Sequence, residues 1–203
     1  MIAIIDYGVG NLFSLKSSFA AIGAEVVVSS DPAVIADAER IVLPGVGAFE
    51  DAAKKLRDSG LDVVVKNEVE KGKPLLGICL GMQMLFEKSY EYGEHEGLGL
   101  IPGAVRPIRP EIPEELKIPH IGWNPLNMTR PKDELFKYIN DRDCVYFVHS
   151  YYAADCDEYV VATAEYGKEL TAAVRKENVW GAQFHPEKSG KVGLNILKAF
   201  CEM

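Results

Sequence analysis

The sequence predicts an α/β fold in which helices cover both faces of a mostly parallel central sheet, with a β-rich C-terminal half. In the first 80 residues, short apolar runs alternate with helical patterns, which is typical of parallel strands joined by crossover helices. These runs are almost continuously apolar, as expected for strands that are buried on both faces. From about Gly97 to Gln183, short β-type runs and prolines replace the helical patterns.

The first half contains alternating strands and helices in chain order. Asp31 precedes Pro32 as an N-cap precedes a proline in the first helical turn. Glycine-rich loops follow the strands, and ligands of such sheets bind where the strands end. The expected strands are Ile2 to Asp6, Glu25 to Ser29, Arg40 to Leu43 and Leu75 to Ile78, and the expected helices are Leu12 to Ile22, Phe49 to Asp58, Leu61 to Lys71 and one that opens over Met82 to Glu87.

The second half is expected to form strands and then a final helix. No repeat or low-complexity linker interrupts the chain, so residues 1–203 are expected to form a single domain. The final helix is predicted from Ser189, its expected cap, to Cys201. The expected strands are Gly103 to Ile108, Cys144 to Ser150, Tyr159 to Ala164, Leu170 to Arg175 and Val179 to Phe184.

Charge and composition exclude several classes of function. The net charge is −8 and no basic stripe is present, which argues against nucleic-acid binding. The four cysteines form no C-x-x-C pair and no metal-ligand spacing, so no metal is expected. The glycine-rich loops lack the third glycine of a dinucleotide fingerprint, and no phosphate loop is present, so no cofactor is expected either. A signal peptide and an apolar segment of about 20 residues are both missing, so we expect a cytoplasmic protein without a membrane span.

A candidate nucleophile lies where the Leu75 to Ile78 strand ends. Gly77-Ile78-Cys79-Leu80-Gly81 has the G-x-nucleophile-x-G form of a nucleophile elbow. Such a turn leaves little room for Cβ atoms two residues on either side of the nucleophile, hence the two glycines. It also places Cys79 at a helix N-terminus, which favours the thiolate. A buried structural cysteine is the alternative reading.

A cysteine nucleophile needs a base and a group that orients the base. His185 lies just after the Val179 to Phe184 strand, in Phe184-His185-Pro186-Glu187. Pro186 favours an extended conformation of the residue before it, so His185 and Glu187 are expected to project to the same side. The pattern therefore predicts a Cys79, His185 and Glu187 triad, although a histidine at a strand end beside an unrelated glutamate would share this spacing.

Backbone donors for an oxyanion are also expected near Cys79. The Leu80 N–H follows the nucleophile directly and is one donor by elbow geometry. Pro44-Gly45-Val46-Gly47 ends another strand and could present a second N–H, although an ordinary strand-to-helix turn explains the same glycines.

The Cys79 elbow and the His185-Pro186-Glu187 segment together resemble the signature of triad (class I) glutamine amidotransferases, which have a flavodoxin-like fold. Further segments are similar to the glutaminase subunits of imidazole glycerol phosphate synthase, an enzyme of histidine biosynthesis. These segments follow the family order and cover nearly the whole chain. They are Asp6 to Asn11, Pro44 to Gly47, Pro119 to Asn124, Tyr146 to Tyr151 and Gln183 to Ser189.

The resemblance implies that Cys79 forms a glutamyl thioester from glutamine, releasing ammonia, and that water then yields glutamate. It implies that Gln83 and the backbone of His149, Ser150 and Tyr151 bind the substrate. The second oxyanion donor is then the Val46 N–H, which a peptide flip would present when the partner is liganded.

The resemblance also implies a partner. In the family, ammonia passes through a channel to a separate (β/α)₈-barrel cyclase subunit, which makes imidazole glycerol phosphate and an aminoimidazole carboxamide ribotide. The two subunits form a heterodimer. Asn11, Trp123 and Lys188 match family positions near the subunit interface, while an aromatic of the core or rim and a solvated lysine are the simpler readings of the last two.

Other functions share parts of this pattern. A triad glutaminase of another pathway would keep the elbow and differ in its partner. A non-catalytic interaction protein of the same fold would not need all three triad positions to hold competent residues. A generic cysteine hydrolase of this fold would leave Gln83 and the length of the match unexplained.

Overall fold

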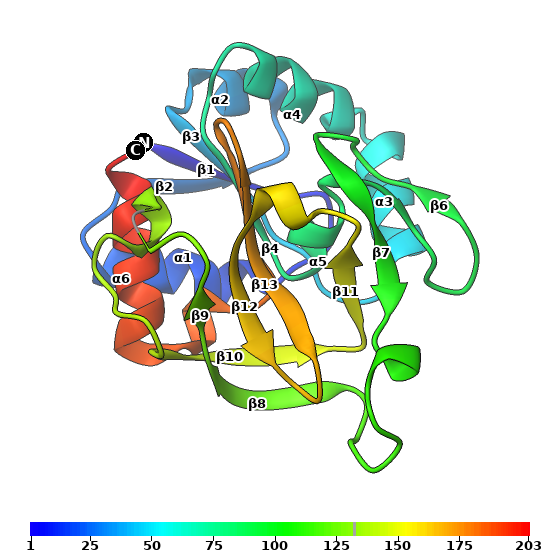
Figure 1. The fold of residues 1–203 in the computed structure, drawn as a ribbon. Coiled ribbons are helices and arrows are strands. Elements are labelled where there is room, and N and C mark those ends of the chain that lie inside the picture. Colours follow the sequence, from blue (N-terminus) through cyan, green and yellow to red (C-terminus); the bar gives the residue numbers. More distant parts are fainter. Residues whose placement is uncertain (132) are drawn as a thin grey trace.

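The computed structural model describes residues 1–131 and 133–203. In these residues, eight strands form a central sheet in the order β2-β1-β3-β4-β14-β13-β12-β9 (Figure 1). The strands β2, β1, β3, β4 and β14 are parallel, and β13, β12 and β9 continue the sheet with antiparallel pairs. The predicted α/β fold is therefore confirmed. The strands are β1 (Ile2–Ile5), β2 (Val26–Ser29), β3 (Arg40–Leu43), β4 (Leu75–Ile78), β9 (Asn127–Met128), β12 (Val160–Glu165), β13 (Glu169–Lys176) and β14 (Val179–Ala182).

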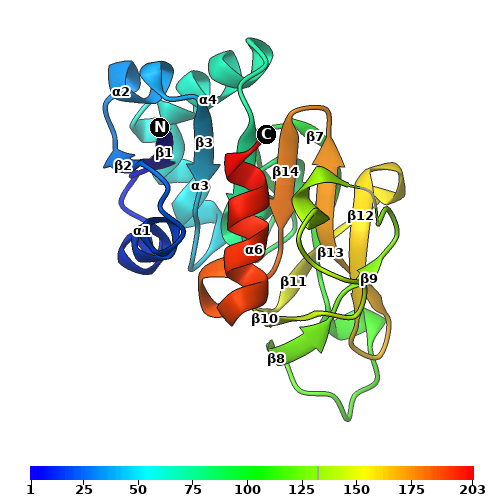
Figure 2. The ribbon, with the colours of Figure 1, turned by 90° about the vertical axis from the view of Figure 1, so that its left-hand side faces the viewer.

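Helices cover both faces of the parallel strands. They are α1 (Leu12–Ala21), α2 (Pro32–Asp37), α3 (Phe49–Asp58), α4 (Leu61–Glu70), α5 (Leu80–Gln83) and α6 (Gly190–Cys201). Successive strand residues point to opposite faces. Accordingly, Ile2 and Ile4 belong to one apolar core, which includes side chains of α1 and α6, and Ala3 and Ile5 belong to another, which includes side chains of α3 and α4. Figure 1 shows α1 and α6 apart from α3 and α4, and Figure 2 gives the view from the side on which α1 and α6 lie.

The α2 helix begins as its sequence predicts. The Asp31 carboxylate accepts a hydrogen bond of 2.8 Å from the Ala33 N–H, and Pro32 occupies the first helical turn. This cap provides an acceptor for a backbone N–H in the first turn, which has no partner within the helix.

Two small sheets lie beside the central one. The first pairs β8 (His120–Pro125) with β10 (Cys144–His149), and the second has the order β11-β7-β5-β6. The strands of the second sheet are β5 (Phe86–Ser89), β6 (His95–Glu96), β7 (Ile101–Pro107) and β11 (Tyr151–Ala154). Among the described residues, none of the helices is both long and apolar enough to pass through a bilayer.

The helix expected over Met82 to Glu87 is wrong in its extent. The α5 helix covers only Leu80–Gln83, and Phe86 begins the strand β5. The Phe86 carbonyl accepts a hydrogen bond of 3.0 Å from the Gly99 N–H, and Phe86 pairs in parallel with Ile101. Pairing with residues distant in sequence thus overrides the local helical pattern.

Ser189 does not cap α6 through its side chain, contrary to the sequence prediction. Its hydroxyl donates to the His185 carbonyl at 2.6 Å and accepts from the Tyr146 N–H at 2.9 Å. Ser189 therefore ties the segment that carries His185 to β10.

Candidate active site

Cys79 lies in a strained turn between β4 and α5. Its φ of 54° and ψ of −112° are rare for a residue with a side chain, and such strain costs about 1–3 kcal/mol. A Cβ on Gly77 would lie 2.7 Å from the Gly81 carbonyl oxygen, and one on Gly81 would lie 1.9 Å from the Leu43 carbonyl oxygen. Both glycines are therefore required by close backbone contacts, as the predicted elbow demands.

The neighbouring strand β14 brings His185 to the elbow. β14 pairs in parallel with β4, and the Cys79 N–H donates to the Ala182 carbonyl at 2.7 Å. His185 Nδ1 lies 2.8 Å from Glu187 Oε1, and both side chains are 3% exposed. The expected extended geometry is wrong at Glu187, because Pro186–Lys188 form a 3₁₀ turn. This turn still directs the carboxylate onto the ring.

The environment of His185 favours the imidazolium form. Burial lowers the pKa of His185, but hydrogen bonds to Cys79 and Glu187, and the charges of both, outweigh burial and raise the pKa from 6.5 to about 9. A protonated His185 beside Cys79 is placed to donate a proton during a reaction at that sulfur.

The raised pKa of His185 predicts a pH dependence of stability. Because the pKa is higher in the folded state, the stabilisation is complete below about pH 6.5 and is lost as the pH rises through about 9. We expect urea denaturation to show this contribution to the free energy of unfolding falling by up to roughly 3 kcal/mol across that range. Cys79→Ala should flatten the dependence, and an equal slope in both proteins would contradict the assignment.

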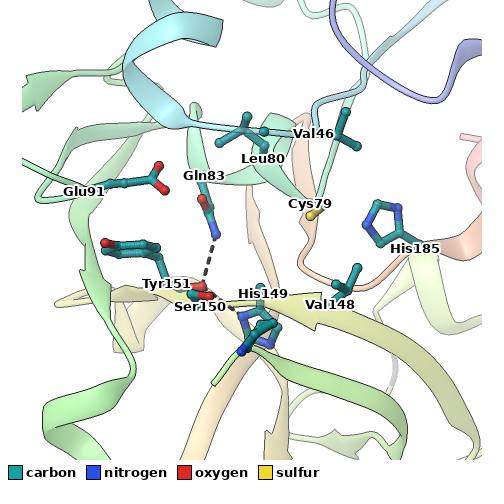
Figure 3. A pocket seen from close by; sticks show the side chains of 12 residues that line it. Val46, Cys79, Leu80, Gln83, Glu91, Val148, His149, Ser150, Tyr151 and His185 are labelled. Atoms are coloured by element: carbon teal, nitrogen blue, oxygen red, sulfur yellow. Dashed lines mark hydrogen bonds between the residues drawn. The ribbon is translucent and has the colours of Figure 1, made fainter. Parts of the chain in front are cut away.

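A pocket of about 310 Å³ opens beside Cys79 (Figure 3). It brings together the triad candidates Cys79 and His185 with all the substrate-binding and oxyanion candidates from the sequence. Among its lining residues are Val46, Cys79, Leu80, Gln83, Glu91, Val148, His149, Ser150, Tyr151 and His185.

The Gln83 side chain lies in a fixed orientation. Its Nε2 donates to the Tyr151 carbonyl at 3.1 Å and to Gln183 Oε1 at 3.0 Å. Both amide hydrogens are therefore used, and Oε1 remains an acceptor for a ligand in the pocket. Gln183 Nε2 in turn lies 3.8 Å from Cys79 Sγ, which links the thiol to the rest of the pocket.

The sequence reasoning assigned no role to two polar residues of this site. Glu91 directs its carboxylate toward the pocket in Figure 3, and one oxygen accepts a hydrogen bond of 2.6 Å from the Phe49 N–H. Burial raises the pKa of Glu91. Gln183 is fully buried. A glutamine that follows the apolar run of β14 was a usable signal for Gln183, but the loop around Glu91 carried none.

The Pro44 to Gly47 loop lies directly against the elbow. A Cβ on Gly45 would be 2.6 Å from the Gly81 nitrogen, so two glycines permit this approach. The buried Tyr7 hydroxyl donates to the Pro44 carbonyl at 2.6 Å and holds the loop. Val46 thus lines the pocket across from Leu80, whose N–H at the start of α5 has no partner within the helix.

The three interface candidates lie on the side of His185 and Glu187. Asn11 lines a small cavity with both of these residues. Trp123 is 54% exposed and contacts the Tyr146 ring edge-on at 6.0 Å. Lys188 Nζ lies 5.7 Å from the centre of the same Tyr146 ring. Lys188 is therefore oriented by an aromatic ring.

The site has the parts required for acyl transfer. A nucleophile, a histidine, a carboxylate and backbone donors lie around one cavity, as that chemistry requires. Within residues 1–131 and 133–203, His, Cys, Asp and Glu side chains do not gather in any group that could hold a metal ion.

Comparison with known proteins agrees with this chemistry. The family model "Glutamine amidotransferase class-I" matches residues 3–203. Imidazole glycerol phosphate synthase subunit HisH of Syntrophotalea carbinolica is 49% identical, with full coverage of both chains. The HisH subunit of Geobacter sulfurreducens is 50% identical over the whole chain and 98% of its own length, and that of Aquifex aeolicus is 50% identical over 97% of the chain and 94% of its own length.

Solved structures show the same fold at low sequence identity. A crystal structure of a glutamine amidotransferase superposes with a TM-score of 0.77 at 20% identity and covers all of this chain and 98% of its own. The structure of PurLQS from Thermotoga maritima gives 0.76 at 20% identity, with coverage of 99% and 97%. Since the family model spans nearly every residue and relatives about half identical align over the full length, the chain belongs to the class-I glutamine amidotransferase family, within the group of HisH subunits.

Proposed function

We propose that the protein is the glutaminase subunit of imidazole glycerol phosphate synthase, with Cys79, His185 and Glu187 as its catalytic triad. The observation that carries the proposal is the buried pair of His185 and Glu187, 2.8 Å apart, beside a cysteine in elbow geometry. Relatives about half identical over the full length, named as HisH subunits, support the choice of pathway.

The Cys79 thiolate attacks the side-chain amide carbon of glutamine, and His185 gives its proton to the departing nitrogen. Ammonia leaves and a glutamyl thioester remains. His185 then takes a proton from water, which attacks the thioester and releases glutamate and the thiolate. Glu187 holds the His185 ring through Nδ1 and stabilises its cation, so that Nε2 faces the reaction.

The Leu80 and Val46 N–H groups stabilise the oxyanion that forms on the amide oxygen. Leu80 follows the nucleophile at the start of α5, where helix geometry leaves its N–H free of intrahelical bonds. Val46 lies on the glycine-rich loop beside the elbow, and the peptide that carries its N–H follows Gly45, where the absence of a side chain permits the peptide to turn. We propose that this turn completes the site when the partner binds its ligand. A liganded complex with the Val46 N–H directed away from the oxyanion would contradict that part.

The amino-acid end of glutamine binds at the other end of the pocket. Backbone groups of His149, Ser150 and Tyr151 take the carboxylate end. The free Gln83 Oε1 and the Glu91 carboxylate accept hydrogen bonds from the α-ammonium group. A carboxylate and an amide oxygen in one partly buried place suit a cation, which donates only.

Glu91→Gln tests the ammonium site. The substitution keeps an acceptor for the Phe49 N–H but removes the charge. We expect the KM for glutamine to rise roughly 10- to 100-fold, as for the loss of a charged hydrogen bond, with kcat nearly unchanged. Steady-state glutaminase kinetics would show this. Glu94→Gln, at an exposed carboxylate of the same loop, is the matched control and should leave KM unaltered.

The ammonia is consumed by a partner. We propose a heterodimer with the (β/α)₈-barrel cyclase subunit, which receives ammonia through a channel and makes imidazole glycerol phosphate and aminoimidazole carboxamide ribotide. Asn11, Trp123 and Lys188 lie on the interface. Their position beside His185, and the exposure of Trp123, Val46 and Phe13, support this face.

We further propose that residues 1–203 act as one amidotransferase domain in the cytoplasm. The family model spans almost the whole chain, and all four cysteines are unpaired, as in reducing compartments. Kinship with biosynthetic subunits supports the same location.

The deciding experiment measures glutamate release from glutamine by the purified chain. It is run alone and with the cyclase subunit plus the nucleotide ligand of that subunit. Weak activity alone and strong stimulation by the liganded partner are expected. Activity that does not change when the liganded partner is added would instead indicate a glutaminase of another pathway or a free hydrolase. No activity under either condition would indicate a non-catalytic member of the family.

A further inference from the structure

A row of hydrogen bonds joins β8 to the glutamine pocket. Asn124 Oδ1 lies 3.0 Å from His120 Nε2, and His120 Nδ1 lies 3.0 Å from His149 Nε2. At the far end, His149 Nδ1 lies 2.8 Å from the Tyr151 carbonyl oxygen. His120 and His149 are both buried, so their ring nitrogens depend on each other and on the two end groups.

At both ends of this row, the atom that faces an imidazole ring is an oxygen that can only accept a hydrogen bond from the ring. The Tyr151 end is a carbonyl oxygen. At the other end, Asn124 Nδ2 donates to the Glu165 carbonyl at 3.0 Å, which directs Oδ1 toward His120. Turning the amide over would place two oxygens against each other. Each of the three contacts therefore needs a hydrogen from an imidazole ring.

Two neutral imidazoles supply only two hydrogens for these three contacts. A third hydrogen would make one ring cationic, which burial disfavours. Burial lowers the pKa of His120 and outweighs the hydrogen bond to Asn124, which raises it. Burial also lowers the pKa of His149 to about 3, although the hydrogen bond to the Tyr151 carbonyl acts in the opposite direction. The Tyr166 ring stacks on His120, but its hydroxyl donates to the Lys117 carbonyl. At neutral pH the row is therefore one hydrogen short.

The shortage leaves three arrangements, each of which loses one contact. In the first, His149 Nδ1–H bonds the Tyr151 carbonyl, His120 Nδ1–H bonds His149 Nε2, and the Asn124 contact is lost. In the second, His120 Nε2–H bonds Asn124, His149 Nε2–H bonds His120 Nδ1, and the Tyr151 contact is lost. In the third, His120 Nε2–H bonds Asn124, His149 Nδ1–H bonds the Tyr151 carbonyl, and the contact between the two rings is lost. The Tyr151 carbonyl also orients Gln83.

We propose that His120 and Asn124 are positioning residues, which set the Tyr151 carbonyl and Gln83 through the tautomer of His149. This inference rests on the proposed function only in taking the pocket to bind glutamine. Trp123 and Ile121, beside His120 and Asn124 on β8, are more than half exposed. A partner that docks on β8 and displaces the Asn124 amide would therefore select the first arrangement. In that arrangement the His149 Nδ1–H bond fixes the Tyr151 carbonyl, which orients Gln83.

Two substitutions at one position test the relay. Both Asn124→Ala and Asn124→Asp lose the bond to the Glu165 carbonyl, so each controls for the structural effect of the other. Alanine removes the acceptor at the β8 end and should leave a single tautomer with His149 Nδ1–H. Aspartate holds the additional hydrogen, so all three ring N–H groups should be present at a pH where the native row has two.

The readout is the ring-nitrogen shifts of the 15N-histidine-labelled full chain, which has four histidines. We expect averaged shifts for His120 and His149 in the native protein, one neutral tautomer in Asn124→Ala, and a cationic pair persisting to higher pH in Asn124→Asp. Identical shifts in all three proteins, or a single tautomer in the native one, would overturn the proposal.

Kinetics with the partner subunit provide the second readout. Asn124→Ala should lower the KM for glutamine about fivefold, the effect of one hydrogen bond, with kcat unchanged. A raised KM in both variants would indicate a merely structural role and overturn the proposal. The ring shifts do not depend on hydrolysis. Shifts that follow the prediction in a chain that does not release glutamate would reject the proposed function and support the relay.

Discussion

Replacing Cys79 with alanine is expected to reduce glutamine hydrolysis on the order of 10⁴- to 10⁶-fold, because members of a nucleophile–base unit act together. No other thiol replaces it: the described residues that line the pocket include no second cysteine. The loss should appear in kcat, as measured by glutamate release at saturating glutamine with the partner present. Glutamine binding should persist, since Gln83 and Glu91 are untouched.

Cys144→Ala is the matched control. Cys144 is a free, exposed cysteine at the start of β10, outside the pocket. It should retain native activity. A glutamine-like electrophile should label the native chain at Cys79 and leave Cys144 unmodified. Substantial hydrolysis by Cys79→Ala would contradict the thioester mechanism. Labelling of a residue other than Cys79 that abolishes activity would also contradict it.

Gly81→Ala is expected to prevent the elbow from forming and to destabilise the whole fold. The added Cβ would lie 1.9 Å from the Leu43 carbonyl oxygen and 3.1 Å from the Pro44 carbonyl carbon. Backbone atoms on both sides cannot move without separating β3 from the elbow, so relief requires distortion of the central sheet. We expect the free energy of unfolding to fall by about 4 kcal/mol or more, beyond the usual range of single substitutions.

Gly60→Ala separates this steric effect from the general effect of changing a glycine. At Gly60 an added Cβ would meet no atom within 4 Å, and only its φ of 71° opposes the change. A loss of about 1 kcal/mol is expected there. Urea denaturation of both variants decides, and similar losses at Gly60 and Gly81 would contradict the role of close packing at the elbow.

The order of the first strands and helices followed from local signals in the sequence. Alternating apolar runs marked β1, β3 and β4, and the pairing of Asp31 with Pro32 marked the start of α2. The elbow was predictable because steric demands select glycine at fixed spacing from Cys79. The same logic identified His185 beside Glu187, although the turn between them is 3₁₀ and not extended.

The features that the sequence did not reveal depend on contacts between distant segments. Phe86 joins a strand because β7 accepts it, and Ser189 bonds Tyr146 across 43 residues. Glu91 reaches the pocket through the Phe49 N–H, which no spacing rule connects to it. The bond between His120 and His149 likewise appears only when β8 and β10 pair.

The adjacency of β4 and β14 has a consequence for synthesis of the chain on the ribosome. Cys79 is translated roughly a hundred residues before His185, yet the two meet only when β14 enters the sheet beside β4. Such long-range pairing forms late in folding, because the chain loses the entropy of loop closure before the new contacts stabilise the sheet. Under the proposed mechanism, a nascent chain therefore carries the nucleophilic cysteine without its base and cannot hydrolyse glutamine. Under that mechanism, hydrolysis requires β14 to join the sheet, and β14 is the last strand of the sheet to be synthesised.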